Sequence, residues 1–168
     1  WAFEPTLVRD YIKADTLWHN RGLCLTQGEV PWDMKKRMGR LFFTSYRGPH
    51  YRLWGPGQVQ VCFRSSVNGY EFSPVGADTV VYTGGASECT FEFDSDSTLW
   101  VVTRLDDGDT AGFGSQVGWA YRFSWHRWHL APPVSHCYMS PKLFRHQKHI
   151  YLIARRQLSI RPFGWANR

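Results

Sequence analysis

Apolar and polar positions alternate along the stretch from Gly118 to His129. Aromatic residues occupy every second position, and smaller or polar residues stand between them: Trp119, Tyr121, Phe123 and Trp125. Side chains with this period point to opposite faces of a strand, so the pattern predicts a half-buried β-strand. Each ring can bury roughly 150–250 Å². We therefore expect the four rings to share the core face of the protein.

The same period of two recurs upstream of this stretch. Val59, Val61 and Phe63 alternate with polar residues, and Asn68-Gly69 is a strong two-residue turn signal. Further strand patterns cover residues 70–72, 79–83, 89–94 and 99–105. Short strands with turn residues between them are typical of antiparallel sandwiches and barrels. We predict a mainly β protein with a single antiparallel, jelly-roll-like β-sandwich, whose core covers residues 58–131.

The predicted sandwich has an extension on either side. Residues 1–57 are expected to form an N-terminal extension of loops and a short helix, indicated by apolar residues at 7, 8, 11, 12, 17 and 18. Within it, residues 32–40 fit a solvated helical turn that docks two Met on the core, or an element that contacts phosphates. Pro132-Pro133 ends the sandwich, and residues 132–168 are expected to form a basic C-terminal extension with a strand at 149–154.

Composition changes this picture in two respects. Aromatic residues make up 17% of the chain, with nine Trp, and Trp and Arg are enriched where surfaces bind tightly. No run approaches the roughly 18–20 apolar residues of a membrane span, so none is expected. Four cysteines, Cys24, Cys62, Cys89 and Cys137, lack a Cys-x-x-Cys pair. They favour scattered core thiols in a reducing compartment over two disulfides in a secreted domain.

Charge is segregated along the chain. Residues 1–64 carry a net charge of +5, residues 65–121 carry −8, and residues 122–168 carry +9. No acid occurs from residue 110 to the end. A basic flank of this kind suits a polyanionic partner.

No catalytic pattern is found. The chain has no Gly-x-Ser-x-Gly, phosphate-binding loop or His-Glu-x-x-His motif, and the glycines at 112, 114 and 118 are spaced wrongly for a dinucleotide fingerprint. We therefore expect no enzyme, no cofactor and no small-molecule substrate. Acids in two loops, at 94, 96, 106, 107 and 109, could ligate Ca²⁺. Ordinary turns explain them equally, and we expect no metal.

The C-terminal flank interleaves cations with rings, so that charge could meet phosphates while exposed bases stack on aromatic side chains. A second basic run lies at residues 35–40. The candidate RNA-binding residues are Arg122, Arg127, Lys142, Arg145, His146, Lys148, His149, Arg155, Arg156, Arg161, Lys35, Lys36, Arg37 and Arg40.

Two resemblances bear on fold and function. The path from Asp78-Thr-Val-Val through Thr90-Phe-Glu-Phe-Asp to Gly118-Trp-Ala-Tyr-Arg-Phe-Ser, within residues 78–124, resembles the closing half of CUB-like jelly-roll domains of large ubiquitin ligases. The last strand of those domains often has a similar Trp-Gly-Tyr-Lys-Phe pattern, and the resemblance implies a jelly-roll sandwich. In general character, a basic, Arg- and Trp-rich chain resembles the accessory proteins of divergent mitochondrial ribosomes.

The sequence thus predicts a non-enzymatic structural subunit of a large ribonucleoprotein, a mitochondrial ribosome, located in mitochondria. Its expected partners are ribosomal RNA and neighbouring ribosomal proteins. The alternative is a jelly-roll binding module for peptide, glycan or calcium, with rings in a groove and acidic loops at its end.

Overall fold

The structure is a computed structural model that describes residues 9–14, 16–23, 25–48, 59–105 and 114–157. All regular elements in these ranges are β-strands, and none of the described residues is helical. The strands form antiparallel sheets, which confirms the prediction of a mainly β, sandwich-like fold.

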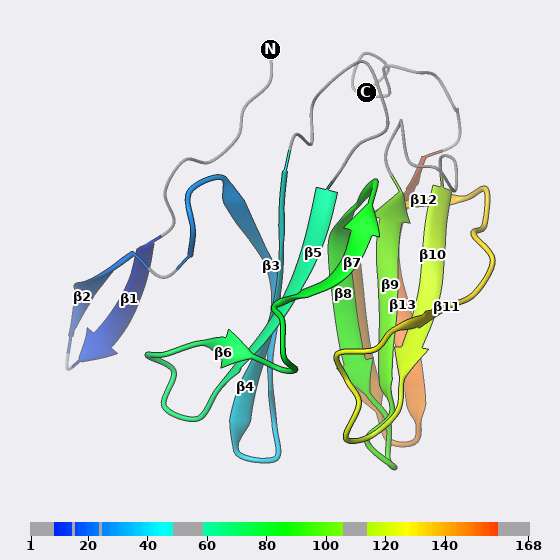
Figure 1. Cartoon of the computed structure of the whole chain (residues 1–168). Coiled ribbons are helices and arrows are strands. Elements are labelled where there is room, and N and C mark those ends of the chain that lie inside the picture. Colours follow the sequence, from blue (N-terminus) through cyan, green and yellow to red (C-terminus); the bar gives the residue numbers. More distant parts are fainter. Residues whose placement is uncertain (1–8, 15, 24, 49–58, 106–113, 158–168) are drawn as a thin grey trace.

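Two sheets face each other across the core (Figure 1). Sheet 1 has the order β3 (Glu29–Arg37), β4 (Arg40–Arg47), β5 (Val59–Ser66) and β6 (Ser73–Pro74), and β7 (Val80–Gly84) also pairs with β5. Sheet 2 has the order β11 (His129–Leu130), β10 (Gly114–Ala120), β9 (Leu99–Leu105) and β8 (Ala86–Phe93).

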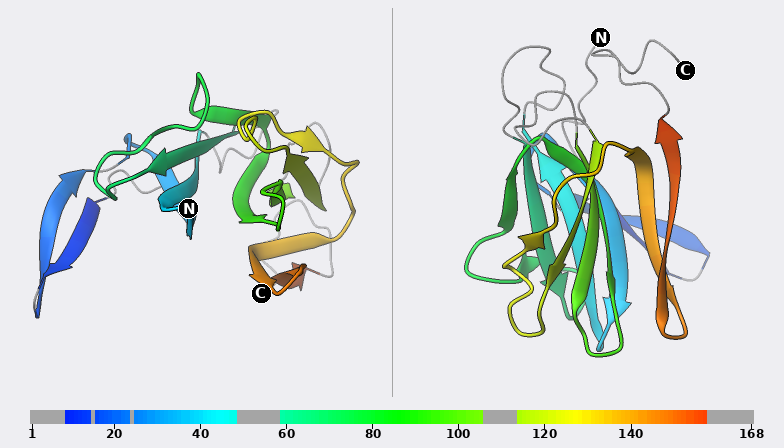
Figure 2. Two further views of the ribbon diagram at one scale, coloured as in Figure 1. Left: turned by 90° about the horizontal axis from the view of Figure 1, so that it is seen from below. Right: turned by 90° about the vertical axis from the view of Figure 1, so that its right-hand side faces the viewer.

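Two hairpins flank this pair of sheets. One hairpin, β1 (Arg9–Ala14) with β2 (Leu17–Leu23), stands apart from the body of the protein (Figure 1). The other, β12 (Cys137–His146) with β13 (His149–Gln157), lies against sheet 2, and Figure 2 shows it as a separate layer. The C-terminal flank is therefore mostly a folded hairpin.

Aromatic rings from both sheets fill the core. Phe42 on β4 stacks on Phe63 of β5 at a centroid distance of 5.8 Å and meets Phe93 of β8 edge-on at 4.9 Å. Phe63 meets Phe91 of β8 at 5.3 Å. Edge-to-face and offset pairs at these distances are the favoured ring geometries. The two sheets are thus joined by rings rather than by aliphatic side chains alone.

The short helix expected near the N-terminus is wrong in the described residues, because residues 9–14 and 17–23 are strands. The expected helical turn at 32–40 is wrong as well. Met38 and Gly39 have φ of 50° and 73°, which is the backbone of a tight two-residue hairpin turn, and they join β3 to β4. Sheet 1 therefore includes strands that precede residue 58.

The predicted aromatic strand is only half correct. β10 ends at Ala120, and the chain then turns, with hydrogen bonds from Ser124 N to Tyr121 O (3.0 Å) and from Arg127 N to Ser124 O (2.8 Å). Tyr121 is 56% exposed and Phe123 83% exposed, so neither lies in the core. Trp125 does reach the core, from the turn, and meets Phe42 at 5.4 Å.

Close packing explains why the aromatic side of β10 faces outward. Gly118 and Ala120 point to the core, and a Cβ at Gly118 would lie 2.6 Å from Leu130 Cδ2 and 2.9 Å from Val101 Cγ2. Only small residues fit there, so the large rings occupy the opposite face. The alternating sequence pattern indicates that the strand has two different faces. It does not indicate which face packs against a second layer.

Two buried ion pairs join strands of one sheet, the first across the intervening β4 and the second between the paired strands β8 and β9. Arg64 on β5 pairs with Glu29 on β3, and Arg104 on β9 pairs with Glu88 on β8 at 2.7 Å. Burial alone would raise the pKa of Glu29, but hydrogen bonds from Arg64, Ser45 and Thr26 outweigh it and lower that pKa. Each pair removes one acid and one base from the surface, so the net surface charge is unchanged.

Three of the four cysteines, Cys62, Cys89 and Cys137, are buried free thiols, as expected, and Cys24 lies outside the described residues. No helix among the described residues has the length and apolar character needed to cross a bilayer.

The core assignment predicts very different effects at two phenylalanines. Phe42→Ala should lower the free energy of unfolding by about 3–5 kcal/mol, because it leaves a cavity among three rings. Phe123→Ala should change it by less than about 0.5 kcal/mol, because the ring faces solvent. Urea unfolding of both variants measures this, and equal losses would contradict the assignment.

Candidate nucleic-acid interface

Side chains of sheet 2 hold the backbone of β12. Tyr138 N donates to Ser115 Oγ of β10 at 2.8 Å, and Ser140 N donates to Glu88 Oε2 of β8 at 2.5 Å. Further along, Leu143 N donates to Thr90 Oγ1 of β8 at 2.8 Å. The strand therefore crosses the face of sheet 2 that points away from sheet 1, which we call the outer face of sheet 2.

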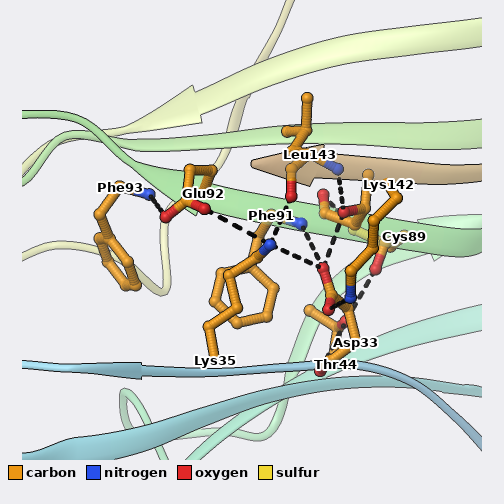
Figure 3. Close-up of polar contacts among 10 residues, drawn as sticks. Asp33, Lys35, Thr44, Cys89, Phe91, Glu92, Phe93, Lys142 and Leu143 are labelled. Carbon is orange, nitrogen blue, oxygen red and sulfur yellow. Dashed lines mark hydrogen bonds and ion pairs between the residues drawn. The ribbon is translucent and has the colours of Figure 1, made fainter. Parts of the chain in front are cut away.

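A buried carboxylate ties this strand to both sheets (Figure 3). The side chain of Asp33 on β3 is completely buried, and its Oδ2 accepts hydrogen bonds from Thr90 Oγ1 (2.7 Å) and Phe91 N (3.4 Å) of β8. Its Oδ1 is paired with Lys142 Nζ of β12. An unpaired buried carboxylate would be costly, so this charge depends on donors from three strands.

Lys35 completes the same network. Its Nζ lies 3.6 Å from Asp33 Oδ2 and 3.4 Å from Glu92 Oε2, and it donates to the backbone oxygen of Leu143 at 2.5 Å. The ammonium also lies 5.8 Å from the centre of the Phe91 ring. Lys35 was predicted to contact RNA, but its ammonium makes its contacts within the protein, at the junction of β3, β8 and β12.

The far side of the β12–β13 hairpin carries rings and cations. Leu143 faces sheet 2, so the side chains next to it on β12 and their partners on β13 point the other way. Phe144 and Tyr151 are cross-strand partners whose rings stack at 5.3 Å and 18°. They are 39% and 44% exposed. We call this surface the hairpin face; it consists of Phe144, His146, His149, Tyr151, Ile153 and Arg155. Lys142 has the same register, but its Nζ turns to Asp33.

More cations surround the hairpin face. Arg145, Lys148 and Arg156 are exposed on the same hairpin, and residues 137–157 include no Asp or Glu. Arg155 is also exposed, and its Nη2 donates to Ser140 Oγ at 2.7 Å. The fold thus brings seven predicted residues together: Lys142, Arg145, His146, Lys148, His149, Arg155 and Arg156.

The remaining predicted residues do not join this cluster as one surface. Arg122 and Arg127 are exposed in the turn after β10, and Lys36 is exposed on β3. Arg37 Nη2 donates to Asp94 O at 3.2 Å, and Arg40 Nη2 donates to Ser65 Oγ at 2.8 Å. The run at 35–40 is therefore divided between internal and exposed positions. Arg161 lies outside the described residues.

The acidic loop that could ligate calcium has another role in its described part. Asp94 Oδ1 accepts from the backbone N–H of Asp96 and Thr98, both at 3.1 Å, and Asp94 Oδ2 accepts from Trp100 Nε1 at 3.0 Å. A hydrogen bond with Asp94 and others with Thr98 lower the pKa of Asp96 to about 2. No three potential metal ligands gather within the described ranges. Residues 106, 107 and 109 lie outside them.

A shallow pocket opens beside β3, β4 and β5. Its volume is about 370 Å³, and it is lined by Gln27, Gly28, Arg47, Gly48 and Gln60. Arg47 Nε is held by Gln60 Oε1 at 2.9 Å. These lining residues include neither a nucleophile nor an acid–base pair, so the pocket suggests no reaction.

The sequence matches no known protein family, and no curated protein is similar to it.

Sequence reasoning missed the role of Phe144. Its neighbours were selected for charge, and its stacking on Tyr151 depends on the register of the hairpin. A signal was present: residues 142–146 and 149–153 pair across a turn at Gln147-Lys148, which places aromatic residues opposite each other.

Asp33 provides a test of how the hairpin is anchored. Asp33→Asn should lower the free energy of unfolding by about 1–3 kcal/mol, because two ammonium groups lose a buried carboxylate. Hydrogen exchange should become faster in β12 and β13 while β9 stays protected. Lys36→Gln, on the same strand but exposed, is the matched control. Equal acceleration in all strands, or none, would contradict this anchoring role.

Proposed function

We propose that this protein is a non-enzymatic structural subunit of a large ribonucleoprotein and that it contacts RNA through the hairpin face. The observation that carries the proposal is the stacked pair of Phe144 and Tyr151 among exposed cations on a hairpin without acids. Cationic side chains bind phosphates, and unpaired bases stack on the faces of aromatic rings. We propose a mitochondrial ribosome as the assembly, with ribosomal RNA and neighbouring ribosomal proteins as partners. The reason is that the composition of this chain resembles that of the accessory proteins of divergent mitochondrial ribosomes.

Charge supports this proposal beyond the net value of +6. Glu29, Asp33 and Glu88 are buried in pairs with basic side chains, so they contribute little negative charge to the surface. Three exposed cations of the hairpin are Arg145, Lys148 and Arg156. None of them forms an ion pair with an acid among the described residues. Exposed, unpaired cations are the ones that can release counterions from a nucleic acid.

A peptide-binding module is the second candidate, because one observation favours it. Among the described strands, β13 pairs only with β12, so its outer edge offers backbone donors and acceptors. Ile153 on this strand is exposed and apolar. An open edge of this kind can accept a strand from another protein. Binding of this type would depend weakly on salt.

The experiment that tests RNA binding is a titration of a structured RNA across a salt series. The logarithm of the binding constant should fall with the logarithm of salt concentration, and each lost single-strand contact should flatten the slope by about 0.7. The variant Arg145→Gln/Lys148→Gln/Arg156→Gln should flatten it by about two units. It leaves Lys142 and Arg155, which have contacts within the protein, unchanged.

The matched control removes the same charge from sheet 1. Lys36→Gln/Arg40→Gln/Arg47→Gln lowers the net charge equally but lies on β3 and β4. We expect it to keep most of the slope. If both triple variants change the slope equally, binding depends on overall charge; if the hairpin variant changes nothing, the cations that surround the hairpin face do not contact RNA. Circular dichroism checks that each variant is folded.

A further inference from the structure

We propose that the outer face of sheet 2 carries a second contact site, a row of four rings that stacks on unpaired bases. The rings belong to Trp100, Trp119, His129 and Tyr121, and we call them the ring row. This inference rests on the proposed function and adds the class of ligand: the RNA at this face is single-stranded. None of these four residues was among the RNA contacts expected from sequence.

The ring row follows from strand register. Glu92 of β8 is paired with Trp100 of β9, Trp100 with Trp119 of β10, and Trp119 with His129 of β11. Cross-strand partners share one face of a sheet, so these side chains form a line across four strands. Ring centroids are 6.3 Å apart for Trp100 and Trp119 and 5.7 Å apart for Trp119 and His129. Tyr121 extends the line, 5.6 Å from His129.

The row lies on the same face of sheet 2 as the β12–β13 hairpin. Glu88 and Thr90 of β8 bind the backbone of β12, and Glu92, with the same parity, begins the row. The neighbouring residues Leu99 and Ala120 point to the core on the other side. The ring row and the hairpin therefore share the side of sheet 2 that faces away from sheet 1.

The rings are held in place and still reachable. Tyr121 and His129 are exposed, while Trp100 and Trp119 are half-buried. The indole of Trp100 donates to Asp94 Oδ2, which fixes its orientation, and Trp119 and His129 lie nearly parallel, at 20°. Rings that are already ordered lose little entropy on binding. An exposed aromatic patch that serves no core commonly marks a binding surface.

The charges near the ring row indicate which kind of ligand binds there. Arg122 and Arg127 are exposed in the turn that joins β10 to β11, close in sequence to Tyr121 and His129 at one end of the row. No acid occurs from residue 110 onward, so the end of the row at Tyr121 and His129 favours an anion. At the other end, Glu92 is paired with Lys35 and Asp94 accepts from Trp100 Nε1. In a duplex the base faces are stacked on each other and cannot reach protein rings. Rings flanked by arginines therefore fit single-stranded RNA.

The test uses the full chain and two probes of equal length, an oligouridylate of about 12 nucleotides and an RNA duplex, at one salt concentration. We expect the single strand to bind about ten-fold more tightly and to quench tryptophan fluorescence. Tyr121→Ala/His129→Ala should weaken single-strand binding by at least about 5- to 30-fold, the loss for one or two stacked bases at the low end of about 1 kcal/mol each. Tyr121→Phe, which keeps a ring, should retain the affinity.

The control and the outcomes separate this inference from the proposed function. Trp18→Ala removes an exposed ring from the β1–β2 hairpin and should change nothing. Equal affinity for single strand and duplex, or full affinity in the Tyr121→Ala/His129→Ala variant, overturns the ring row as a binding site. If in that case the Arg145→Gln/Lys148→Gln/Arg156→Gln variant still loses affinity, RNA binding by the hairpin face stands. Absence of binding to either probe overturns both.

Discussion

The carboxylate of Asp33 is the interaction on which the arrangement of layers depends. It is completely buried on an edge strand of sheet 1, and its partners come from sheet 2 and from β12. A charge in this position is tolerated only if every layer supplies its donor, so the position of β12 is fixed together with that of β3. The hairpin is held as part of the sandwich, and its opposite side is free to meet a ligand.

The contacts that hold β12 also change how the distribution of charge along the sequence is interpreted. Along the sequence, acids concentrate in residues 65–121 and bases in the flanks, as though two kinds of surface were present. In space, Lys35 of one flank pairs with Glu92, and the backbone of Ser140 in the other binds Glu88. Acids of the middle segment therefore hold the basic flanks in place. Arg145, Lys148 and Arg156 remain exposed, and all three lie on the β12–β13 hairpin.

Local alternation was sufficient to predict strands whose two faces differ. β9 coincides with the predicted segment, and β5 and β8 differ from theirs by at most three residues at either end, because each strand has one face in the core. The chain does turn at Asn68-Gly69, where Gly69 has φ 74°, but Ser65 pairs with Ser73, so the turn belongs to a longer loop and the predicted strand at 70–72 is wrong. The candidate cations were recognised by composition, and seven of them lie on one hairpin.

The errors have a common physical origin in partners distant in sequence. Residues 32–37 form a strand because β4 pairs with them and Asp33 contacts β8, and no local sequence pattern indicates either contact. The rings at 119 and 121 face outward because Val101 and Leu130 leave no room on the core side of β10. The ring row could therefore not be recognised before the register of four strands was known.

The central claim is that RNA lies on the side of the molecule formed by the hairpin face and the outer face of sheet 2. Ultraviolet cross-linking of the full chain to RNA, followed by mass spectrometry of the cross-linked peptides, tests it most directly, because aromatic side chains in contact with bases are the ones that react. The cross-links should fall on Tyr151 and Phe144 and on Trp119 and Tyr121. Cross-links confined to sheet 1 or to the β1–β2 hairpin, with none on these four rings, would contradict the claim.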